Sequence, residues 1–502
     1  MSGAQIVNRK QAFNVLFFVE FWERFGYYGL QAVLAGFFVK SLGMEDAESF
    51  VVFGAFSAMV YGYVSLGGYI GDKILGTQRT IILGAVVLML GYFCMALAGA
   101  DKTLVFLALG MIACGNGIFK ANPSSLLSKL YKDAEQELDS AFTLYYMAVN
   151  VGSFISMLLV PIIGVHYGLS LGFIICAMGL VLSIGGFLSF RYLMKGVDSP
   201  AGEKPLSYSK LLLVVLATLV MIVFSSWMLS HLSVAHWLLF AIVVLVYGTF
   251  IKMMLQAKGA QRKKMLAAMI LIVEAIVFFT LYQQMPTSLN FFAIKNVEHS
   301  LMGVAIPDAQ VFQTLNPFWI MLASPILALL YSYFGNRGRD LSMPAKFAVG
   351  MGLTAASFLV VGFSANFANS EGIVSAWWLV ASYFLSSVGE LLISGLGLSM
   401  ISKLVPQKLV GFLMGAWLLT TAISAVIGGW VATLTTVSKD VSDPLQTLPV
   451  YSQVFTDIGI VTMGVTFLMF ITVPVLNRLI EAKDQVNDAT EIVLENKKSV
   501  DK

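Results

Sequence analysis

Residues 13–40 read FNVLFFVEFWERFGYYGLQAVLAGFFVK, an apolar run with three charged residues near its middle. An α-helix needs about 20 predominantly apolar residues to cross a bilayer, and this run is long enough. Ionisable groups inside a span cost about 2.5–3.5 kcal/mol each on insertion scales, so they are rare and commonly functional. The run therefore predicts a membrane-spanning helix that carries a polar site.

The charged residues of this run share one face of the predicted helix. Glu20, Glu23, Arg24, Tyr27 and Gln31 follow one another at intervals of three, one, three and four residues, and this spacing places side chains on one side of an α-helix. One interpretation is a neutral Glu–Arg pair that only ties helices together. Such a pair has no use for a second glutamate, so we favour a proton-binding site in which one carboxylate pairs with Arg24.

Similar apolar runs dominate the rest of the chain. Hydrophobic residues make up 58% of the 502 residues and charged residues 12%, whereas soluble domains carry about 25% charged residues. The net charge of +3 is too small to indicate a nucleic-acid partner. We predict an all-α membrane protein, surrounded by lipid, with fourteen transmembrane helices. These spans lie at about 13–40, 49–71, 80–100, 103–122, 142–164, 168–193, 208–229, 234–254, 265–286, 315–335, 345–366, 375–402, 409–436 and 451–476.

The distribution of basic residues predicts the orientation. If the N-terminus is cytoplasmic, only four of the 31 Lys and Arg residues fall in outward segments, namely Lys40, Lys102, Lys295 and Lys439. Because Lys and Arg accumulate on the cytoplasmic side, we expect both termini there. The predicted domains are a six-helix bundle at 1–194, a linker with two extra helices at 195–264, a second six-helix bundle at 265–480 and a disordered cytoplasmic tail at 481–502.

Three further ionisable residues lie inside predicted spans. Lys120 lies in CGNGIFKAN, whose glycines favour close helix contact, although its late position also fits a lysine that reaches the membrane interface. Glu390 has Ser387 and Ser394 on the same helix face, which fits a cavity-facing site or a hydrogen-bonded structural glutamate. Glu274 stands alone in LIVEAIVFF, where a structural and a functional interpretation are equally open.

The charges of the two halves suit a ligand that carries both signs. Two-bundle transporters bind substrate between their halves near the membrane midplane. Protonation of one first-helix glutamate leaves the first half positive, so the carboxylate of a peptide would bind at Arg24 or Lys120. Its amine would bind at Glu390. The aromatic and amide residues that are candidates to line the same space are Tyr27, Tyr28, Tyr61, Asn150, Asn316 and Trp417.

Longer motifs resemble those of a known family. They are EFWERFGYYG (20–29), GGYIGDKILGTQR (67–79), FTLYYMAVNVGS (142–153), QTLNPFWIMLASP (313–325), GELLISGLGLS (389–399) and GAWLLTTA (415–422). Together they resemble the proton-dependent oligopeptide transporters (POT/PTR) of the major facilitator superfamily, and within these the bacterial dipeptide and tripeptide permeases. The resemblance extends from residue 13 to about 478, and the two inserted helices are typical of the bacterial members.

The resemblance implies a major facilitator fold and proton-coupled import of dipeptides and tripeptides across the bacterial inner membrane. The proton is the expected coupling ion, no other cofactor is expected, and the protein is expected to be no enzyme and to function as a monomer. By position, the resemblance assigns proton coupling to Glu20, Glu23 and Arg24. It assigns the peptide carboxylate to Lys120, the amino terminus to Asn316 and Glu390, and the shaping of side-chain pockets to Tyr27, Tyr28, Tyr61, Asn150 and Trp417.

Asp72 is assigned the role of a latch on the inner face of the first bundle. We expect its carboxylate to accept hydrogen bonds from helix N–H groups and from the nearby Arg79.

Two positions depart from the family pattern. Residues 282–284 read Tyr-Gln-Gln where many members carry an acid, so a pair with Lys120 from that position is in doubt. Ser394-Gly395 stands where members have Ser-Pro, which changes how that helix kinks.

Other functions are also compatible with a protein that spans the membrane many times. An ion channel is disfavoured because no repeated filter sequence is present, and a nutrient sensor is disfavoured because no soluble output domain is present. Among transporters, the alternative is proton-coupled transport of another small zwitterion or of a peptide-like drug.

Overall fold

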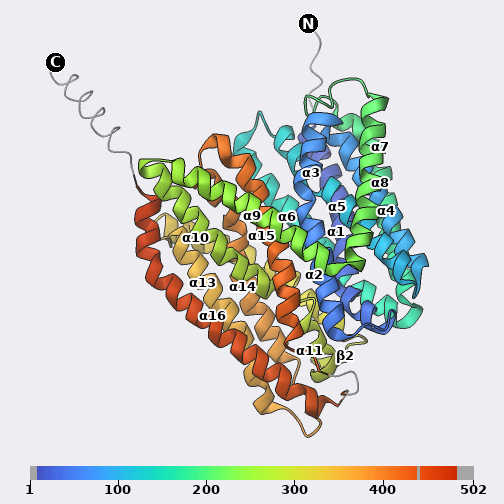
Figure 1. Ribbon diagram of the computed structural model, residues 1–502, viewed down its shortest axis with the longest axis vertical. Coiled ribbons are helices and arrows are strands. Elements are labelled where there is room, and N and C mark those ends of the chain that lie inside the picture. The colour runs from blue at the N-terminus through green and yellow to red at the C-terminus, as the bar shows by residue number, and fades with distance from the viewer. Residues whose placement is uncertain (1–7, 438–440, 442, 483–502) are drawn as a thin grey trace, which may run out of the picture.

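The computed structural model describes residues 8–437, 441 and 443–482, and it is built almost entirely of helices (Figure 1). Thirteen of its described helical segments are long and apolar enough to cross a membrane. The helix α1 (Arg9–Lys40) corresponds to the first predicted span and is long enough to cross as well, but the three charged residues near its middle leave it less apolar than the other thirteen. The prediction of an all-α membrane protein is therefore confirmed, and each of the fourteen predicted spans falls on helix. The predicted tail lies, from residue 483 onward, outside the described residues.

The first half of the chain forms one group of packed helices. Within it, α1 packs against α6 and α7, and α4 packs against α5 and α7. Glycines permit the closest approach: a Cβ at Gly115 on α5 would lie 2.7 Å from the backbone nitrogen of Leu88 on α4. The other helices of this half are α2 (Asp46–Gly62), α3 (Val64–Tyr69), α4 (Thr77–Ala98), α5 (Lys102–Leu130), α6 (Glu135–Tyr167) and α7 (Leu169–Phe190), with a short 3₁₀ helix at Arg191–Met194.

The second predicted span differs from a single regular helix. It divides at Tyr63 into α2 and α3 and ends in a π-helical turn, Ile70–Ile74, which we call the inner turn. π-Helical turns are short and are often found at functional sites. Gly67 lies directly against the backbone of Gly117 on α5, so a side chain there would collide with that helix.

The second half forms a similar group. Here α13 packs against α14 and α16, α12 against α14, and α10 against α15. Before α12, the chain forms the short helix α11 (Ser288–Asn296) and an antiparallel hairpin of β1 (Ser300–Leu301) and β2 (Val304–Ala305), followed by a 3₁₀ segment at Ala309–Thr314. The long helices are α10 (Gly259–Tyr282), α12 (Leu315–Gly335), α13 (Met343–Ser364), α14 (Trp377–Leu404), α15 (Gln407–Thr433) and α16 (Pro444–Ile480), with a 3₁₀ turn at Ala365–Phe367.

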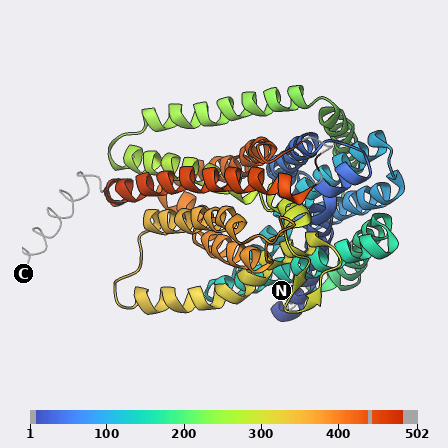
Figure 2. The same cartoon turned by 90° about the horizontal axis from the view of Figure 1, so that it is seen from below.

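The two inserted helices, α8 (Tyr208–Ser230) and α9 (Leu232–Gln256), connect the halves from outside (Figure 2). On α8, the Ser225 hydroxyl lies 2.8 Å from the Tyr63 hydroxyl of the first half. On α9, the Tyr247 hydroxyl lies 2.7 Å from the Thr420 hydroxyl of α15. Most of the apolar surface of α9 is exposed, as expected of a lipid-facing helix.

Contacts between the halves close one end of the molecule. We call the end where α1 begins and α16 ends the inner end, and the opposite end, which carries α11 and the hairpin, the outer end (Figure 1). At the outer end, Lys295 of α11 lies 2.6 Å from the Asp46 carboxylate of α2. The Gln313 side-chain amide donates to the Ala32 carbonyl of α1 at 2.8 Å. These polar contacts hold the halves together at the outer end.

Candidate substrate and proton site

The polar stripe of α1 forms a compact charged cluster. Arg24 Nε lies 3.3 Å from Glu20 Oε1, and the guanidinium also forms an ion pair and a hydrogen bond with the Glu23 carboxylate. All three residues are buried. The helical spacing read from the sequence therefore brings one cation between two carboxylates. A buried charge is tolerated only when it is paired and hydrogen-bonded, and this arrangement provides both.

Each glutamate of the cluster has a second partner on another helix. The Tyr145 hydroxyl of α6 donates a hydrogen bond to Glu20 Oε2, and Asn116 Nδ2 of α5 donates to Glu23 Oε1 at 2.8 Å. Three helices of the first half thus converge on the cluster. Sequence reasoning missed Tyr145, because only its place in the motif at 142–153 distinguishes it from other tyrosines.

Tyrosine rings cover the cations of the site. The Arg24 guanidinium carbon lies 5.5 Å from the centre of the Tyr27 ring and 6.0 Å from that of Tyr28. Lys120 Nζ lies 4.2 Å from the centre of the Tyr61 ring. Such cation–π contacts stabilise a partly desolvated cation without neutralising it. Lys120 also interacts electrostatically with Arg24 and both glutamates, so it belongs to the same cluster.

The second half contributes a carboxylate with an amide beside it. Asn316 Nδ2 of α12 donates to Glu390 Oε2 of α14 at 2.8 Å and lies 3.1 Å from the Ser387 hydroxyl. Glu390 interacts electrostatically with the hydroxyls of Tyr28 and Tyr146 of the first half. Tyr28 therefore interacts with both Arg24 of the first half and Glu390 of the second. We call the group formed by the α1 cluster, Lys120, these tyrosines, Asn316 and Glu390 the central site.

Two predicted lining residues have other partners. Asn150 is buried, and its side-chain amide donates to the Tyr146 carbonyl of its own helix at 2.8 Å. Trp417 is buried between helices of the second half, where its ring packs edge-on against Phe279, with centres 5.9 Å apart, and lies directly against Gly397. Trp417 thus supports the packing of α15 with α10 and α14.

In this conformation Asp72 has another partner than the predicted Arg79. Asp72 lies in the inner turn, and its carboxylate accepts from Lys129 Nζ of α5 at 3.0 Å. Arg79 instead donates to two backbone carbonyls, those of Leu75 at 3.2 Å and Lys204 at 2.9 Å. The expectation rested on proximity in sequence, whereas the packing of α3 on α5 brings a residue from 57 positions away to the inner turn.

The residues at 282–284, one of the two places that depart from the family pattern, contribute to helix packing. Gln284 Nε2 donates to the carbonyls of Thr280 and Gly428, each at 3.0 Å, and its oxygen accepts from the Ser288 hydroxyl at 2.7 Å. Gln284 therefore ties the end of α10 to α15. Gln283, the middle residue of 282–284, stands where family members carry the acid; it is buried, and its side chain lies directly against Gly428 of α15. The helix α14 passes through positions 394 and 395 without a break.

Glu274, whose role the sequence left open, is buried in α10. Its Oε2 atom has no hydrogen-bond partner among the described residues.

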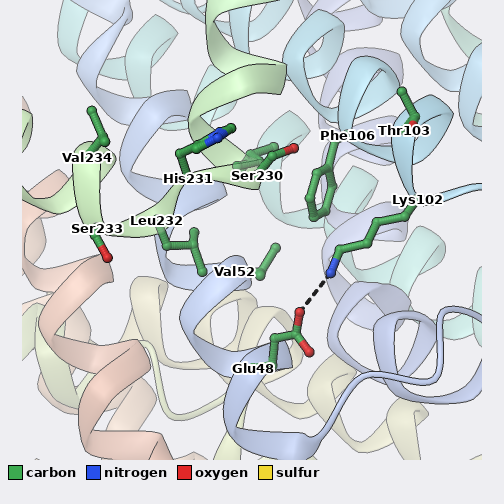
Figure 3. Close-up of a pocket in the computed structure, with 11 residues that line it drawn as sticks. Glu48, Val52, Lys102, Thr103, Phe106, Ser230, His231, Leu232, Ser233 and Val234 are labelled. Carbon is green, nitrogen blue, oxygen red and sulfur yellow. Dashed lines mark hydrogen bonds and ion pairs between the residues drawn. The ribbon is translucent and has the colours of Figure 1, made fainter.

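A cavity at the outer end is separate from the central site. It has a volume of about 500 Å³ and lies between the start of α5 and the turn from α8 to α9. Figure 3 shows the Lys102 ammonium directed at the Glu48 carboxylate, 2.8 Å away, while His231 lies on the far side of Phe106. This ion pair is half-exposed, so it contributes little to stability.

Comparison with known proteins extends these observations. The model of the POT family matches residues 78–452. Dipeptide and tripeptide permease B of Aliivibrio fischeri is 50% identical over 96% of this chain and 98% of its own length. Dipeptide and tripeptide permease A of Proteus mirabilis is 50% identical over 93% of this chain and 95% of its own. A crystal structure of tetrameric PepTSo2 is similar with a TM-score of 0.85 and 38% identity, covering 94% of this chain and all of that one.

Proposed function

The chain belongs to the POT family, and on that premise we propose that it imports dipeptides and tripeptides together with protons across the bacterial inner membrane. The inner end would then face the cytoplasm. The single observation that carries the proposal is the composition of the central site, which combines the cations Arg24 and Lys120 of one half with the Asn316–Glu390 pair of the other. Membership in this family also makes the protein a transporter and not an enzyme.

The central site matches the two fixed ends of a peptide. A carboxylate binds best to cations that are not fully neutralised, and Lys120 contacts a ring and forms no ion pair among the described residues. An ammonium group binds next to Glu390, whose orientation is set by Asn316. The tyrosines between these ends offer apolar faces that tolerate different peptide side chains.

The charges of the site favour the uptake of one proton. Glu20, Glu23, Arg24 and Lys120 together sum to zero, and Glu390 adds one negative charge. Because net charge in a buried site is costly, one bound proton would neutralise the site. A zwitterionic peptide leaves this sum unchanged, so the dependence of peptide on proton must come from the ion pairs of Arg24.

Proton binding also releases Arg24. When a carboxyl of α1 is protonated, its ion pair with Arg24 weakens, and the guanidinium is then free to bind the peptide carboxylate. Glu23 is the more direct candidate because it makes the closer contact with Arg24. Each glutamate keeps a further hydrogen bond during this exchange, Glu20 from Tyr145 and Glu23 from Asn116. In this scheme, the proton is the coupling ion and no other cofactor takes part.

The halves contain a complete site within one chain. For this reason we propose that a monomer is the transporting unit, although PepTSo2 is described as tetrameric. The same zwitterion chemistry would also admit peptide-like drugs, and a related peptide transporter has been solved in complex with alafosfalin.

Uptake of radiolabelled dialanine by proteoliposomes tests the proposed function. We expect accumulation above the external concentration when the external medium is more acidic than the lumen, and simple equilibration without that gradient. Equal accumulation of dialanine with and without the pH gradient would show that uptake is not coupled to protons. Uptake of free alanine or another single zwitterion in preference to dialanine would favour the alternative substrate class.

A further inference from the structure

A basic cavity at the inner end lies away from the central site. It has a volume of about 390 Å³ and is formed by the inner turn, the start of α4 and the linker that leads to α8. We call it the linker cavity. Its charged lining consists of one acid and four bases: Asp72, Lys73, Arg79, Lys204 and Lys210.

Most of the positive charge of the linker cavity is unpaired. Asp72 is already bound by Lys129. Arg79 donates to the Leu75 and Lys204 carbonyls, so it fixes the linker against α4 while keeping its charge. Lys73, Lys204 and Lys210 are exposed, and none of them forms an ion pair within the part of the chain that the structure describes. The cavity thus presents several free ammonium groups to a ligand.

The linker cavity lies at the level of the membrane interface. It lies at the first residues of two membrane-spanning helices, since α4 begins at Thr77 and α8 at Tyr208. Tyr208 is 80% exposed, and one turn further along α8, Leu212 and Leu213 are 59% and 64% exposed. Exposed tyrosines are typical of the headgroup region, and exposed leucines beyond them are typical of lipid contact.

We propose that the linker cavity binds the phosphate headgroup of an anionic phospholipid from the inner leaflet. Ammonium groups form charge-assisted hydrogen bonds with phosphate oxygens, and basic pockets on the cytoplasmic side of membrane proteins attract anionic lipids. Free inorganic phosphate offers the same oxygens, but only a lipid also places acyl chains against the apolar surface of α8. The headgroup would hold the linker, the inner turn and the start of α8 together.

This lipid would act beside the latch of the first half. Asp72 both lines the linker cavity and accepts from Lys129. A phosphate held by the three free lysines brings negative charge near Asp72, so it strengthens the dependence of Asp72 on Lys129. The lipid is therefore a structural ligand of the inner turn and takes no part in peptide binding.

Native mass spectrometry of the purified full-length protein tests the proposal with phosphatidylglycerol, phosphatidylethanolamine and inorganic phosphate as separate probes. We expect wild-type protein to bind phosphatidylglycerol at least tenfold more tightly than phosphatidylethanolamine. Each basic contact to an anionic lipid is worth about a fivefold change in affinity. The variant Lys210→Gln should therefore lose about fivefold, and the combined variant Lys73→Gln, Lys204→Gln and Lys210→Gln should lose the preference for phosphatidylglycerol.

The matched control removes the same number of charges elsewhere at the inner end. It carries Lys258→Gln, Arg262→Gln and Lys263→Gln, three exposed or terminal positions around the start of α10, and it should bind phosphatidylglycerol as wild type does. An equal loss in the control would show that net charge alone attracts the lipid and would overturn the site. Retention of inorganic phosphate without preference for phosphatidylglycerol would overturn the lipid as its occupant.

Discussion

Arg24 contacts both glutamates of α1, and each glutamate has a further partner on a different helix. Arg24 can therefore pair with either carboxylate without moving. A peptide carboxylate that replaces one glutamate in this set exchanges one ion pair for another. Such an exchange avoids the cost of leaving a buried guanidinium unpaired, which is several kcal/mol.

Replacement of Glu23 should uncouple uptake from the proton gradient. In Glu23→Gln, the side chain no longer titrates and no longer binds Arg24 as a carboxylate, so Arg24 stays available to peptide. We expect gradient-driven accumulation of dialanine to fall to the level reached without a gradient, while exchange of internal for external peptide persists. Glu20→Gln should retain part of the accumulation because Glu23 remains. Full accumulation by both variants would exclude the α1 glutamates from coupling.

Blocking the amine of the peptide should abolish recognition by Glu390. An acetylated dialanine leaves the Glu390 carboxylate without its ammonium partner, and an unsatisfied buried group costs about 1–3 kcal/mol. Competition against labelled dialanine measures this difference. In Glu390→Gln, dialanine should lose affinity while acetyl-dialanine changes little, so the two ligands should compete almost equally. A full preference for dialanine in that variant would place the amine elsewhere.

Several site residues were predictable because they lie on one helix. The intervals from Glu20 to Arg24 fix a common face whatever the rest of the fold does. The hydrogen bond from Tyr145 to Glu20 was not predictable, because it depends on how α6 packs on α1. The bond from Asn316 to Glu390 was not predicted either, because 74 residues separate them; the resemblance only assigned both residues to the amino terminus of the peptide.

The α3–inner turn segment shows how glycine sets the contact between elements. Gly67 faces the backbone of Gly117, whereas a Cβ added at its neighbour Gly68 would have its nearest heavy atom, the Cβ of Ala121, at 3.5 Å. This close contact holds α3 against α5, and it thereby positions the inner turn for the contact between Asp72 and Lys129. Sequence alone indicated close helix contact near Asn116, but it gave no sign that the second span divides at Tyr63.

Adding one methyl group should separate these two helices. In Gly67→Ala, the new Cβ would overlap the Gly117 carbonyl, and overpacking of this kind costs about 1–3 kcal/mol. We expect a lower thermal unfolding temperature in detergent than for wild type. The control Gly68→Ala places its Cβ at ordinary contact distance and should unfold near the wild-type temperature. Equal unfolding temperatures for the two variants would contradict the packing described here.

At the scale of the whole molecule, Lys295 and Asp46 join the halves at the outer end, while the pair of Asp72 and Lys129 at the inner end lies within the first half. The second half has an acid–base pair at its own inner end, where Lys346 Nζ lies 2.7 Å from the Asp340 carboxylate. Both pairs are partly exposed, so each is suited to form in one state and break in another.

Loss of the latch should change the populations of states and spare the central site. Asp72 and Lys129 are partly exposed, so their pair is worth about 0.2–1 kcal/mol, a shift of at most about fivefold. Spin labels at Asp139→Cys and Ser332→Cys, in a background without native cysteines, report the distance across the inner end. Asp72→Asn and Lys129→Gln should redistribute these distances alike, and the double variant should add nothing.

Unchanged distances in these variants, together with a large loss of peptide affinity, would instead assign Asp72 to peptide binding. The control variant Lys346→Gln removes the corresponding cation of the second half. This variant should also change the distances between the two spin labels, but to a distribution that differs from that of Asp72→Asn.

The movement of protons with peptide tests the central claim most directly. Proteoliposomes that contain a pH-sensitive dye, with equal pH on both sides and the membrane potential clamped, receive external dialanine. We predict that the lumen acidifies as dialanine enters, that acetyl-dialanine causes no acidification, and that Glu23→Gln exchanges peptide without acidification. Entry of dialanine into wild-type proteoliposomes at constant lumenal pH would contradict coupling through the cluster of Glu20, Glu23 and Arg24.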